Sequence, residues 1–467
     1  MQFDSFTFLI FFVCVLVGYQ FMPGWRAQKS LLLIASYLFY AAWSPQLIIL
    51  IWISTLVDYY VARRIAVTQN VTARKSLLIL SILVNMGILG YFKYADFLLE
   101  NFSQLLATIG VIYSPPAFDI ILPIGISFYT FQTLSYTIDV YRNKIKPTDN
   151  LLDFSLFVTF FPQLVAGPIV RAGDFLPQCK TRKRLTMASV VIGTSLIVWG
   201  IFQKTVLADG LFSPLVDDFY AAEAGQTLAA NWLAIFSFSM QIYYDFAGYS
   251  LCAVGAAMAL GFTLPDNFNA PYAAAGFSDF WHRWHITLSQ WMRDYLYIPL
   301  GGNRQGQIRG LGNLMIVMFL AGLWHGASWN FVLWGLLHGV FLVIEHLLKQ
   351  WKQIMLPVFL TSLLVFTIVS LLWIPFRSTD LQESILIFGQ LFNTGNMGLG
   401  AMSIQQYGAV AVIILTLCYQ YWRRDIYLAD LMYRIPYALQ AALLSVAMLA
   451  IALSSTGDTH AFIYFQF

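Results

Sequence analysis

Histidines are the side chains best suited to proton-transfer chemistry in this 467-residue chain, which contains six of them. An imidazole changes protonation state near neutral pH and can act as a general base. His325 lies in an apolar stretch between Gly322 and Gly326. Ionisable groups are costly at membrane depth and normally face a cavity or a partner, and glycines allow a backbone or a substrate to come close. His325 is therefore a candidate catalytic base, with a histidine that packs between helices as the alternative.

His285 lies in an aromatic stretch that runs from Ser278 to Tyr297. Plotted at 100° per residue as one helix, the stretch places its large apolar side chains on one face, with His285 at the border. That face consists of Trp281, Trp284, Leu288, Trp291 and Tyr295. The pattern predicts an in-plane interfacial helix with its charged face toward the cytosol, on which His285 can face a funnel.

Other polar residues of the apolar segments carry weaker signals. His338 has the same surroundings as His325, but a packing role is favoured. His282 and His285 are three residues apart, yet no adjacent carboxylate or thiol completes a metal site, so we expect none. Asp245 follows two tyrosines; it either orients a histidine or hydrogen-bonds tyrosines, and the second is favoured. No residue is assigned to cofactor binding.

The C-terminal tail, residues 453–467, ends on an aromatic cluster that includes Phe462, Tyr464 and Phe467. An exposed apolar tail is a liability in water, so we expect it to dock on the rest of the chain. It is either a plug in the outer mouth of a bundle or a device that places the Tyr464 phenol inside a channel.

The composition requires a membrane to solvate these elements. Apolar residues make up 59% of the chain and charged residues 10%, against roughly 25% charged in an ordinary soluble domain. Disorder is excluded by the apolar content, and four cysteines are too few for a disulfide framework. With a net charge of +3, nucleic acid is not an expected partner. The expected fold is an all-α, polytopic membrane protein surrounded by lipid, formed by residues 1–467 as a single domain.

Twelve apolar segments are candidate spans. They are 6–22, 31–43, 46–61, 77–99, 117–140, 187–207, 230–250, 313–329, 331–348, 356–376, 405–422 and 436–454. With the N-terminus outside, 23 of the 26 lysines and arginines fall in inner loops, as the positive-inside rule requires. Both termini are therefore expected on the outer side of the membrane, which is the periplasm if the cell is Gram-negative.

Two inner regions, 141–186 and 251–312, are too long to be simple connections, and the first contains Pro162, Gly167 and Pro168 within an apolar run. Broken segments at membrane depth persist only where protein or a water-filled cavity surrounds them. We expect re-entrant and interfacial pieces that line a cytoplasmic funnel.

Several motifs together resemble the membrane-bound O-acyltransferase (MBOAT) family, in particular its alginate and peptidoglycan O-acetylation branch. They are Leu323-Trp-His-Gly-Ala327, Trp281-His-Arg-Trp-His-Ile-Thr-Leu-Ser289, Arg293-Asp-Tyr-Leu-Tyr-Ile-Pro-Leu-Gly-Gly-Asn303, Phe161-Pro-Gln-Leu-Val-Ala-Gly-Pro168 and the final Phe-Ile-Tyr-Phe-Gln-Phe. The resemblance implies a fold of about 11–12 transmembrane helices. It also places the invariant family histidine at His325, a second histidine at His285, and the terminal Phe-x-Tyr-x-x-Phe motif on Phe462, Tyr464 and Phe467.

This resemblance implies an O-acetyltransferase that moves acetyl across the inner membrane to an exported or cell-envelope polysaccharide such as alginate, with peptidoglycan as the alternative acceptor. Acetyl-CoA is the expected donor, and no permanently bound cofactor is expected. Tyr464 is the expected acetyl carrier, and a periplasmic SGNH-type partner is expected to complete the transfer. Two other classes stay open from the residues alone: a transporter or channel, which would also use broken helices and buried histidines, and a non-enzymatic anchor of a polysaccharide machine.

Overall fold

The computed structural model describes residues 1–113, 121–221, 227–350, 357–392, 402–427, 431, 435–454 and 462. Within these ranges every regular element is a helix. The chain divides into two compact units, one of residues 1–194 and 253–265 and one of residues 195–252 and 266–467. The prediction of a single domain over 1–467 stays a prediction.

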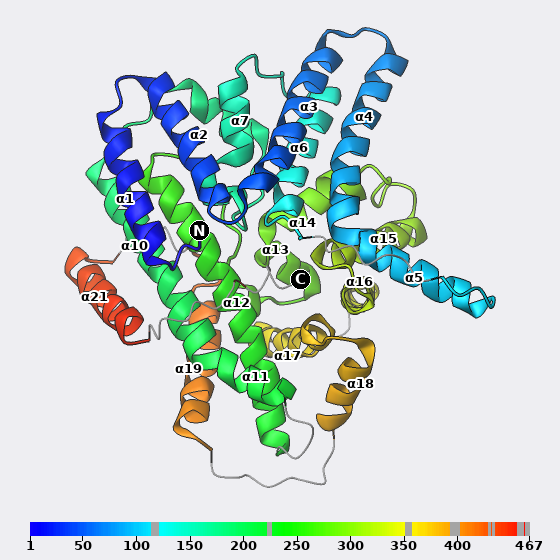
Figure 1. Cartoon of the computed structure of the whole chain (residues 1–467). Helices are drawn as coiled ribbons and strands as arrows, with labels where there is room; N and C mark the ends of the chain where they lie inside the picture. The colour runs from blue at the N-terminus through cyan, green and yellow to red at the C-terminus, as the bar shows by residue number, and fades with distance from the viewer. Residues whose placement is uncertain are drawn as a thin grey trace. The chain divides into compact units, whose positions relative to one another are not determined.

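The first unit contains the N-terminal helices α1 (Phe6–Phe21), α2 (Trp25–Ala41), α3 (Ile48–Val67), α4 (Val71–Leu89), α5 (Ala95–Thr108) and α6 (Ile126–Tyr141). Helices α3, α4 and α6 pack against one another (Figure 1). Their interface is polar at one level, where buried Asp58 accepts hydrogen bonds from Ser81, Asn85 and Thr137. A buried carboxylate needs such donors, because an unsatisfied charge in an apolar interior is very costly.

The first long inner region is folded into short helices, as expected for interrupted segments: α7 (Leu151–Thr159), α8 (Phe161–Leu164), α9 (Ala172–Phe175) and the 3₁₀ segment η3 (Leu176–Lys180). Gly167 is required in this region, since a Cβ there would lie 2.5 Å from the Gln163 backbone. Lys29 of α2 forms a buried ion pair with Asp153 of α7. The interrupted run is thus surrounded by protein, which is the condition for broken helices at membrane depth.

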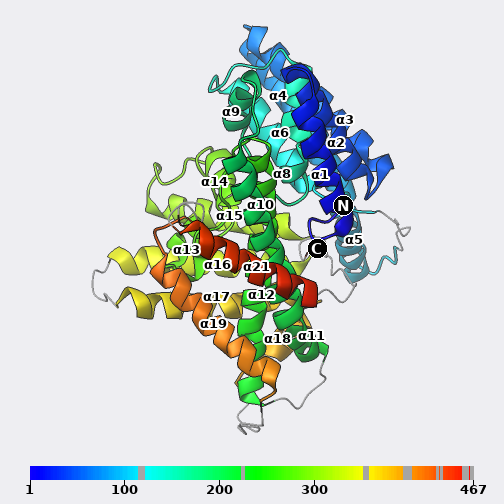
Figure 2. The same cartoon turned by 90° about the vertical axis from the view of Figure 1, so that its left-hand side faces the viewer.

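The second unit contains the C-terminal helices. From residue 195 on, α10 (Met187–Ile201) belongs to this unit and continues through the π-helical η4 (Phe202–Phe212) into α11 (Ser213–Ala221). The next helix, α12 (Leu228–Ala259), belongs to it up to residue 252. Further helices are α15 (Gln307–His325), α16 (Trp329–Gln350), α17 (Val358–Arg377), α18 (Leu381–Gln390), α19 (Ile404–Trp422) and α21 (Tyr437–Ser454). Helix α21 packs on η4 (Figure 2).

Close packing of α15 on α16 depends on glycine. A Cβ on Gly322 would lie 2.2 Å from the carbonyl oxygen of Phe331, and one on Gly335 would lie 2.3 Å from that of Met318. Small residues allow membrane helices to approach at this distance. The expectation that Gly322 admits another backbone is confirmed, and the effect is to hold the end of α15, where His325 lies, firmly against α16.

Seven helices among the described residues are long and apolar enough to cross a membrane. They are Pro45–Val67, Val71–Thr108, Met187–Ala221, Gln307–His325, Trp329–Lys349, Val358–Arg377 and Tyr437–Ser454. The other predicted spans overlap α1, α2, α6, α12 and α19, but α2 begins six residues before its predicted start at 31, α6 begins nine residues after its predicted start at 117, and α12 extends to Ala259, beyond the predicted end at 250. The protein is a multi-pass, all-α membrane protein.

Candidate active site

The aromatic stretch 278–297 is not the single helix that the angular plot assumed. It breaks into α13 (Phe277–Arg283), α14 (Ile286–Met292) and the π-helical η6 (Arg293–Tyr297). The break falls on His285, whose backbone is left-handed, with φ 42° and ψ 54°. The predicted stripe nevertheless points inward: Trp284, Leu288, Trp291 and Tyr295 are buried. The correction therefore concerns His285, which lies in the break instead of on the border of a helical face.

His285 is completely buried among aromatic rings. Its ring centroid lies 4.7 Å from that of Phe246 in α12 and 5.7 Å from that of Trp324 in α15. Burial lowers the pKa of His285 to about 3, so its imidazole is neutral at physiological pH. A neutral imidazole has one N–H donor and one acceptor nitrogen, which lets it hydrogen-bond a reacting group without carrying a charge.

Asn267 holds the backbone on the C-terminal side of His285. The carbonyl oxygen of Asn267 accepts from the N–H of Ile286 at 3.0 Å, and its side-chain oxygen accepts from the Thr287 hydroxyl at 2.8 Å. A non-glycine residue in the left-handed region persists only where the surroundings over-determine it. These bonds supply part of that constraint.

His325 ends α15, and the backbone turns at Gly326. A Cβ on Gly326 would lie 2.1 Å from the ring of Phe331, so only glycine fits there. The His325 ring lies 4.8 Å from Trp334, 5.0 Å from Trp324 and 5.4 Å from Phe376, measured between centroids. The ring centroids of His285 and His325 are 6.5 Å apart. The structure thus brings together two of the three predicted site residues.

Part of the C-terminal tail lies next to this pair. Phe462 is buried, and its ring centroid is 4.7 Å from Tyr249 and 5.7 Å from Phe246. Phe246 in turn contacts His285. The tail position that the structure describes is therefore one ring away from His285. Tyr464 and Phe467 lie outside the described residues.

The ring centroid of His338 lies 4.8 Å from that of Trp334, the same ring that contacts His325. Its other neighbours are aromatic, namely Trp281, Phe280 and Trp373. This aromatic enclosure accords with the packing role that the sequence favoured.

Asp245 has an ionic partner that the sequence did not suggest. Its carboxylate pairs with Lys204 of η4 at 2.5 Å, and the same ammonium lies 2.9 Å from Asp209. All three side chains are at least four-fifths buried. An ionisable residue in an apolar segment normally pairs with another, so the presence of Lys204 in the predicted span 187–207 is the sequence signal for this buried ion pair.

A cavity of about 230 Å³ adjoins the broken helix in this unit. Its lining is mostly apolar, from α14 and α15, with Ser278, His282, Arg293 and Tyr297 as polar members. Neither His285 nor His325 lines it. His282 faces this cavity and bonds the Ser278 carbonyl at 2.5 Å, whereas His285 is buried, so the two do not form a metal pair. No cluster of three or more candidate metal ligands occurs in the part of the chain that the structure describes.

Comparison with known proteins agrees with this architecture. The sequence profile of MBOAT, the membrane-bound O-acyltransferase family, matches residues 141–374. A Pseudomonas aeruginosa protein named "Probable alginate O-acetylase AlgI" is 38% identical over 423 residues, which cover 90% of this chain and 80% of that protein. The peptidoglycan O-acetyltransferase of Helicobacter pylori is 35% identical over 406 residues, or 80% of this chain and 75% of that one.

A more remote relative is the teichoic acid D-alanyltransferase of Bacillus subtilis, 28% identical over 249 residues, or 51% of this chain and 62% of that protein. The chain belongs to the membrane-bound O-acyltransferase family. It is an acyltransferase of the membrane, and the resemblance seen in its motifs is confirmed.

Proposed function

We propose that this protein is an O-acetyltransferase that carries acetyl groups from a cytoplasmic donor across the inner membrane, for O-acetylation of an exported or envelope polysaccharide. One observation carries the proposal: His285 and His325 lie with ring centroids 6.5 Å apart in an aromatic enclosure, and Phe462 of the terminal motif packs one ring away. The relatives named for alginate and peptidoglycan O-acetylation support acetyl as the group transferred.

In this proposal the donor is acetyl-CoA and the first acceptor is Tyr464. The phenol of Tyr464 has an ordinary pKa near 10 and is a poor nucleophile at neutral pH. His325 acts as general base and takes the phenol proton as the oxygen attacks the thioester carbonyl. A carbon–oxygen bond forms, the carbon–sulfur bond breaks, and the proton passes from His325 to the leaving thiolate of CoA. The products are O-acetyl-Tyr464 and free CoA.

His285 takes a supporting role in this scheme. Because its imidazole is neutral, it can donate one hydrogen bond to the carbonyl oxygen as negative charge develops there. Preorganised donors of this kind contribute strongly to acyl transfer in a water-poor site. The aromatic rings around both histidines exclude water, which also protects the thioester from hydrolysis.

The donor approaches from the cytoplasm, where the predicted inner loops concentrate lysine and arginine and attract the phosphates of CoA. The cavity beside α14 presents Arg293 and His282. Its volume of about 230 Å³ is below the roughly 300–1,000 Å³ of typical drug-sized sites, so it suits a slender part of a ligand. Both termini are periplasmic in this proposal, and the acetyl group leaves on that side to an SGNH-type partner.

The final acceptor in this proposal is a polysaccharide, and two kinds of polysaccharide are supported by the relatives. The alginate relatives favour an exported uronate polymer, and the Helicobacter relative favours peptidoglycan. Both use the same chemistry in this chain, because the partner recognises the glycan.

The test is incubation of the purified full chain with acetyl-labelled acetyl-CoA, with Tyr464→Phe as the matched variant. Tyr464→Phe keeps the ring and removes only the hydroxyl. We expect label on the C-terminal peptide of the wild type, none on that of the variant, and no acetylated polymer in cells that carry the variant. A transporter or an anchor predicts neither labelling nor donor cleavage. Normal polymer acetylation by Tyr464→Phe would show that the tail is a plug.

A further inference from the structure

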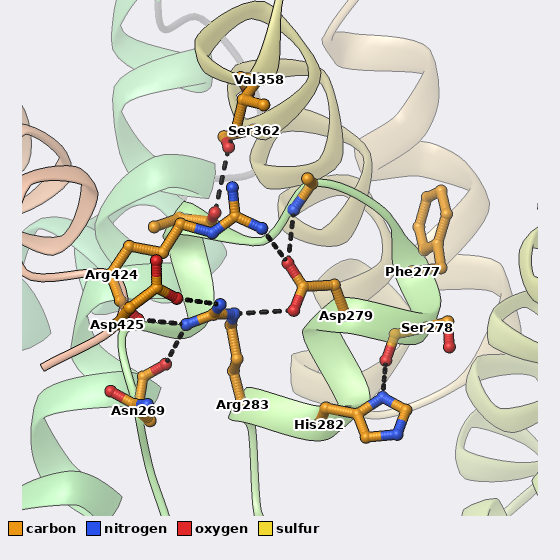
Figure 3. Close-up of polar contacts among 12 residues, drawn as sticks. Asn269, Phe277, Ser278, Asp279, His282, Arg283, Val358, Ser362, Arg424 and Asp425 are labelled. Atoms are coloured by element: carbon orange, nitrogen blue, oxygen red, sulfur yellow. Dashed lines mark hydrogen bonds and ion pairs between the residues drawn. The ribbon is translucent and has the colours of Figure 1, made fainter. Parts of the chain in front are cut away.

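Charged side chains form a network on one side of α13, the helix that precedes His285 (Figure 3). Asp279 of α13 accepts three hydrogen bonds: from the Ala275 N–H at 2.9 Å, from Arg283 Nε at 2.8 Å and from Arg424 Nη2 at 2.7 Å. Arg424 lies just after α19, 145 residues away in the chain. The side chain of Asp279 is 29% exposed and that of Arg424 22% exposed, so this ion pair is partly shielded from solvent.

Arg283, at the end of α13, extends the network. Its Nη1 group donates to the carbonyl oxygens of Asn269 at 3.3 Å and Arg424 at 2.5 Å, and Nη2 reaches Asp425 at 3.2 Å. The backbone carbonyl of Arg283 accepts from the N–H of Asn269 at 2.9 Å. The last turn of α13 is thereby attached both to the end of α19 and to the segment 267–269, which holds the far side of the His285 turn.

The start of α13 is also fixed. The carboxylate of Glu345, from α16, accepts from the N–H groups of Phe277 and Ser278. A carboxylate at a helix N-terminus satisfies donors that the helix leaves unpaired. With Glu345 and the Asp279–Arg424 pair at its first turn and Arg283 at its last, α13 has little freedom to rotate or slide.

We infer that Asp279 and Arg424 are positioning residues for His285: their ion pair fixes the first turn of α13 and, through the bond between Asp279 and Arg283, its last turn, so that the left-handed turn presents the His285 ring to His325. Only Trp284 separates the charged anchor at Arg283 from His285, which is too short a link to absorb a shift of the helix. A left-handed histidine is unfavourable by itself, and it reverts to an ordinary backbone conformation when its anchors loosen. The inference rests on the proposed role of His285 in acetyl transfer.

The two carboxylates of the network differ in exposure and in the number of bonds they accept. Asp279 bonds both arginines and a backbone N–H, and its side chain is 29% exposed. The side chain of Asp425 is 85% exposed, and its one ion pair among the described residues is with Arg283. Asp279→Asn and Asp425→Asn remove the same charge from the same network. They form a matched pair in which only the first should disturb His285.

The experiment measures acetyl-CoA cleavage by the purified full chain. For Asp279→Asn we expect turnover roughly 10- to 100-fold lower, the range for misplacement of a catalytic group by about 1 Å, with the KM for acetyl-CoA changed less than about twofold. Asp425→Asn should stay within about twofold of the wild type. Arg424→Ala should behave like Asp279→Asn, and Arg424→Lys, which keeps the positive charge, should recover part of the loss.

A double-substitution cycle separates positioning from general structure. The effects of substitutions that act through the same group are not additive. Asp279→Asn should therefore cause no further loss of turnover when His285→Ala is already present. Wild-type turnover of Asp279→Asn, or a full additional loss in the His285→Ala background, would overturn the inference while leaving the proposed function intact. If His285→Ala itself cleaves the donor normally, the role of His285 falls, and the inference falls with it.

Discussion

Phe462→Ala should reduce acetyl transfer without damaging the histidine pair. Phe462 is only 2% exposed, and it belongs to the tail that carries Tyr464 in the proposed mechanism. Its ring contacts Tyr249 at 4.7 Å and Phe246 at 5.7 Å. Removing the ring removes these contacts, and the tail is then held less tightly near His285.

The size of the effect follows from these two ring contacts. Each aromatic pair contributes about 0.5–1.5 kcal/mol beyond the area it buries, so the pair of contacts contributes about 1–3 kcal/mol. At 1.36 kcal/mol per factor of ten, tail docking weakens by about 5- to 150-fold. When the docked and undocked forms of the wild-type tail have comparable populations, the fraction of molecules with Tyr464 in place falls by a similar factor.

The assay is transfer of label from acetyl-CoA to the C-terminal peptide, measured for the wild type, Phe462→Ala and Phe462→Leu. Leucine keeps most of the apolar volume, so Phe462→Leu should retain most of the transfer. The thermal midpoint of the detergent-solubilised protein should change little, because the contact lies in the tail. Transfer by Phe462→Ala at the wild-type rate would refute the reasoning that docking of the tail limits the reaction.

Three further predictions address the histidines and the topology. His325→Ala should lower acetyl transfer roughly 10²- to 10⁴-fold, the usual value of general-base catalysis, in a protein that accumulates normally; near-normal polymer acetylation would make His325 structural. The pKa of His285 is about 6.5 in the unfolded chain and about 3 in the folded one. Between these values the unfolded state binds a proton that the folded state does not. The free energy of unfolding should therefore decrease as pH drops below about 6.5, by up to about 1.4 kcal/mol per pH unit. Unfolding measured at pH 5 to 7.5 should show a smaller slope for His285→Phe than for the wild type, and equal slopes would contradict the burial argument. A cysteine placed within 171–186 should resist an impermeant reagent in intact spheroplasts, and its labelling would invert the proposed orientation.

Composition and pattern alone determined that this is an all-α membrane protein. A chain with 59% apolar and 10% charged residues cannot build a polar surface, and that conclusion requires no knowledge of which segments touch. The selection of His325 as a candidate also needed only the sequence, since a histidine between glycines in an apolar stretch is costly wherever the helix packs; its catalytic role stays a prediction. These are local properties, and a sequence displays them directly.

Long-range contacts determined the features of the site that the sequence did not predict. The angular plot of 278–297 assumed a continuous helix, but the helix breaks at His285, and Asn267, which lies outside the plotted stretch, bonds Ile286 and Thr287 beside the break. Asp245 pairs with Lys204, 41 positions earlier, although its adjacent tyrosines suggested local partners. The periodicity of a segment does not indicate which distant side chains it will contact. The burial of His285 and its distance from His325 therefore follow only from the tertiary packing that brings α13, α14 and α15 together.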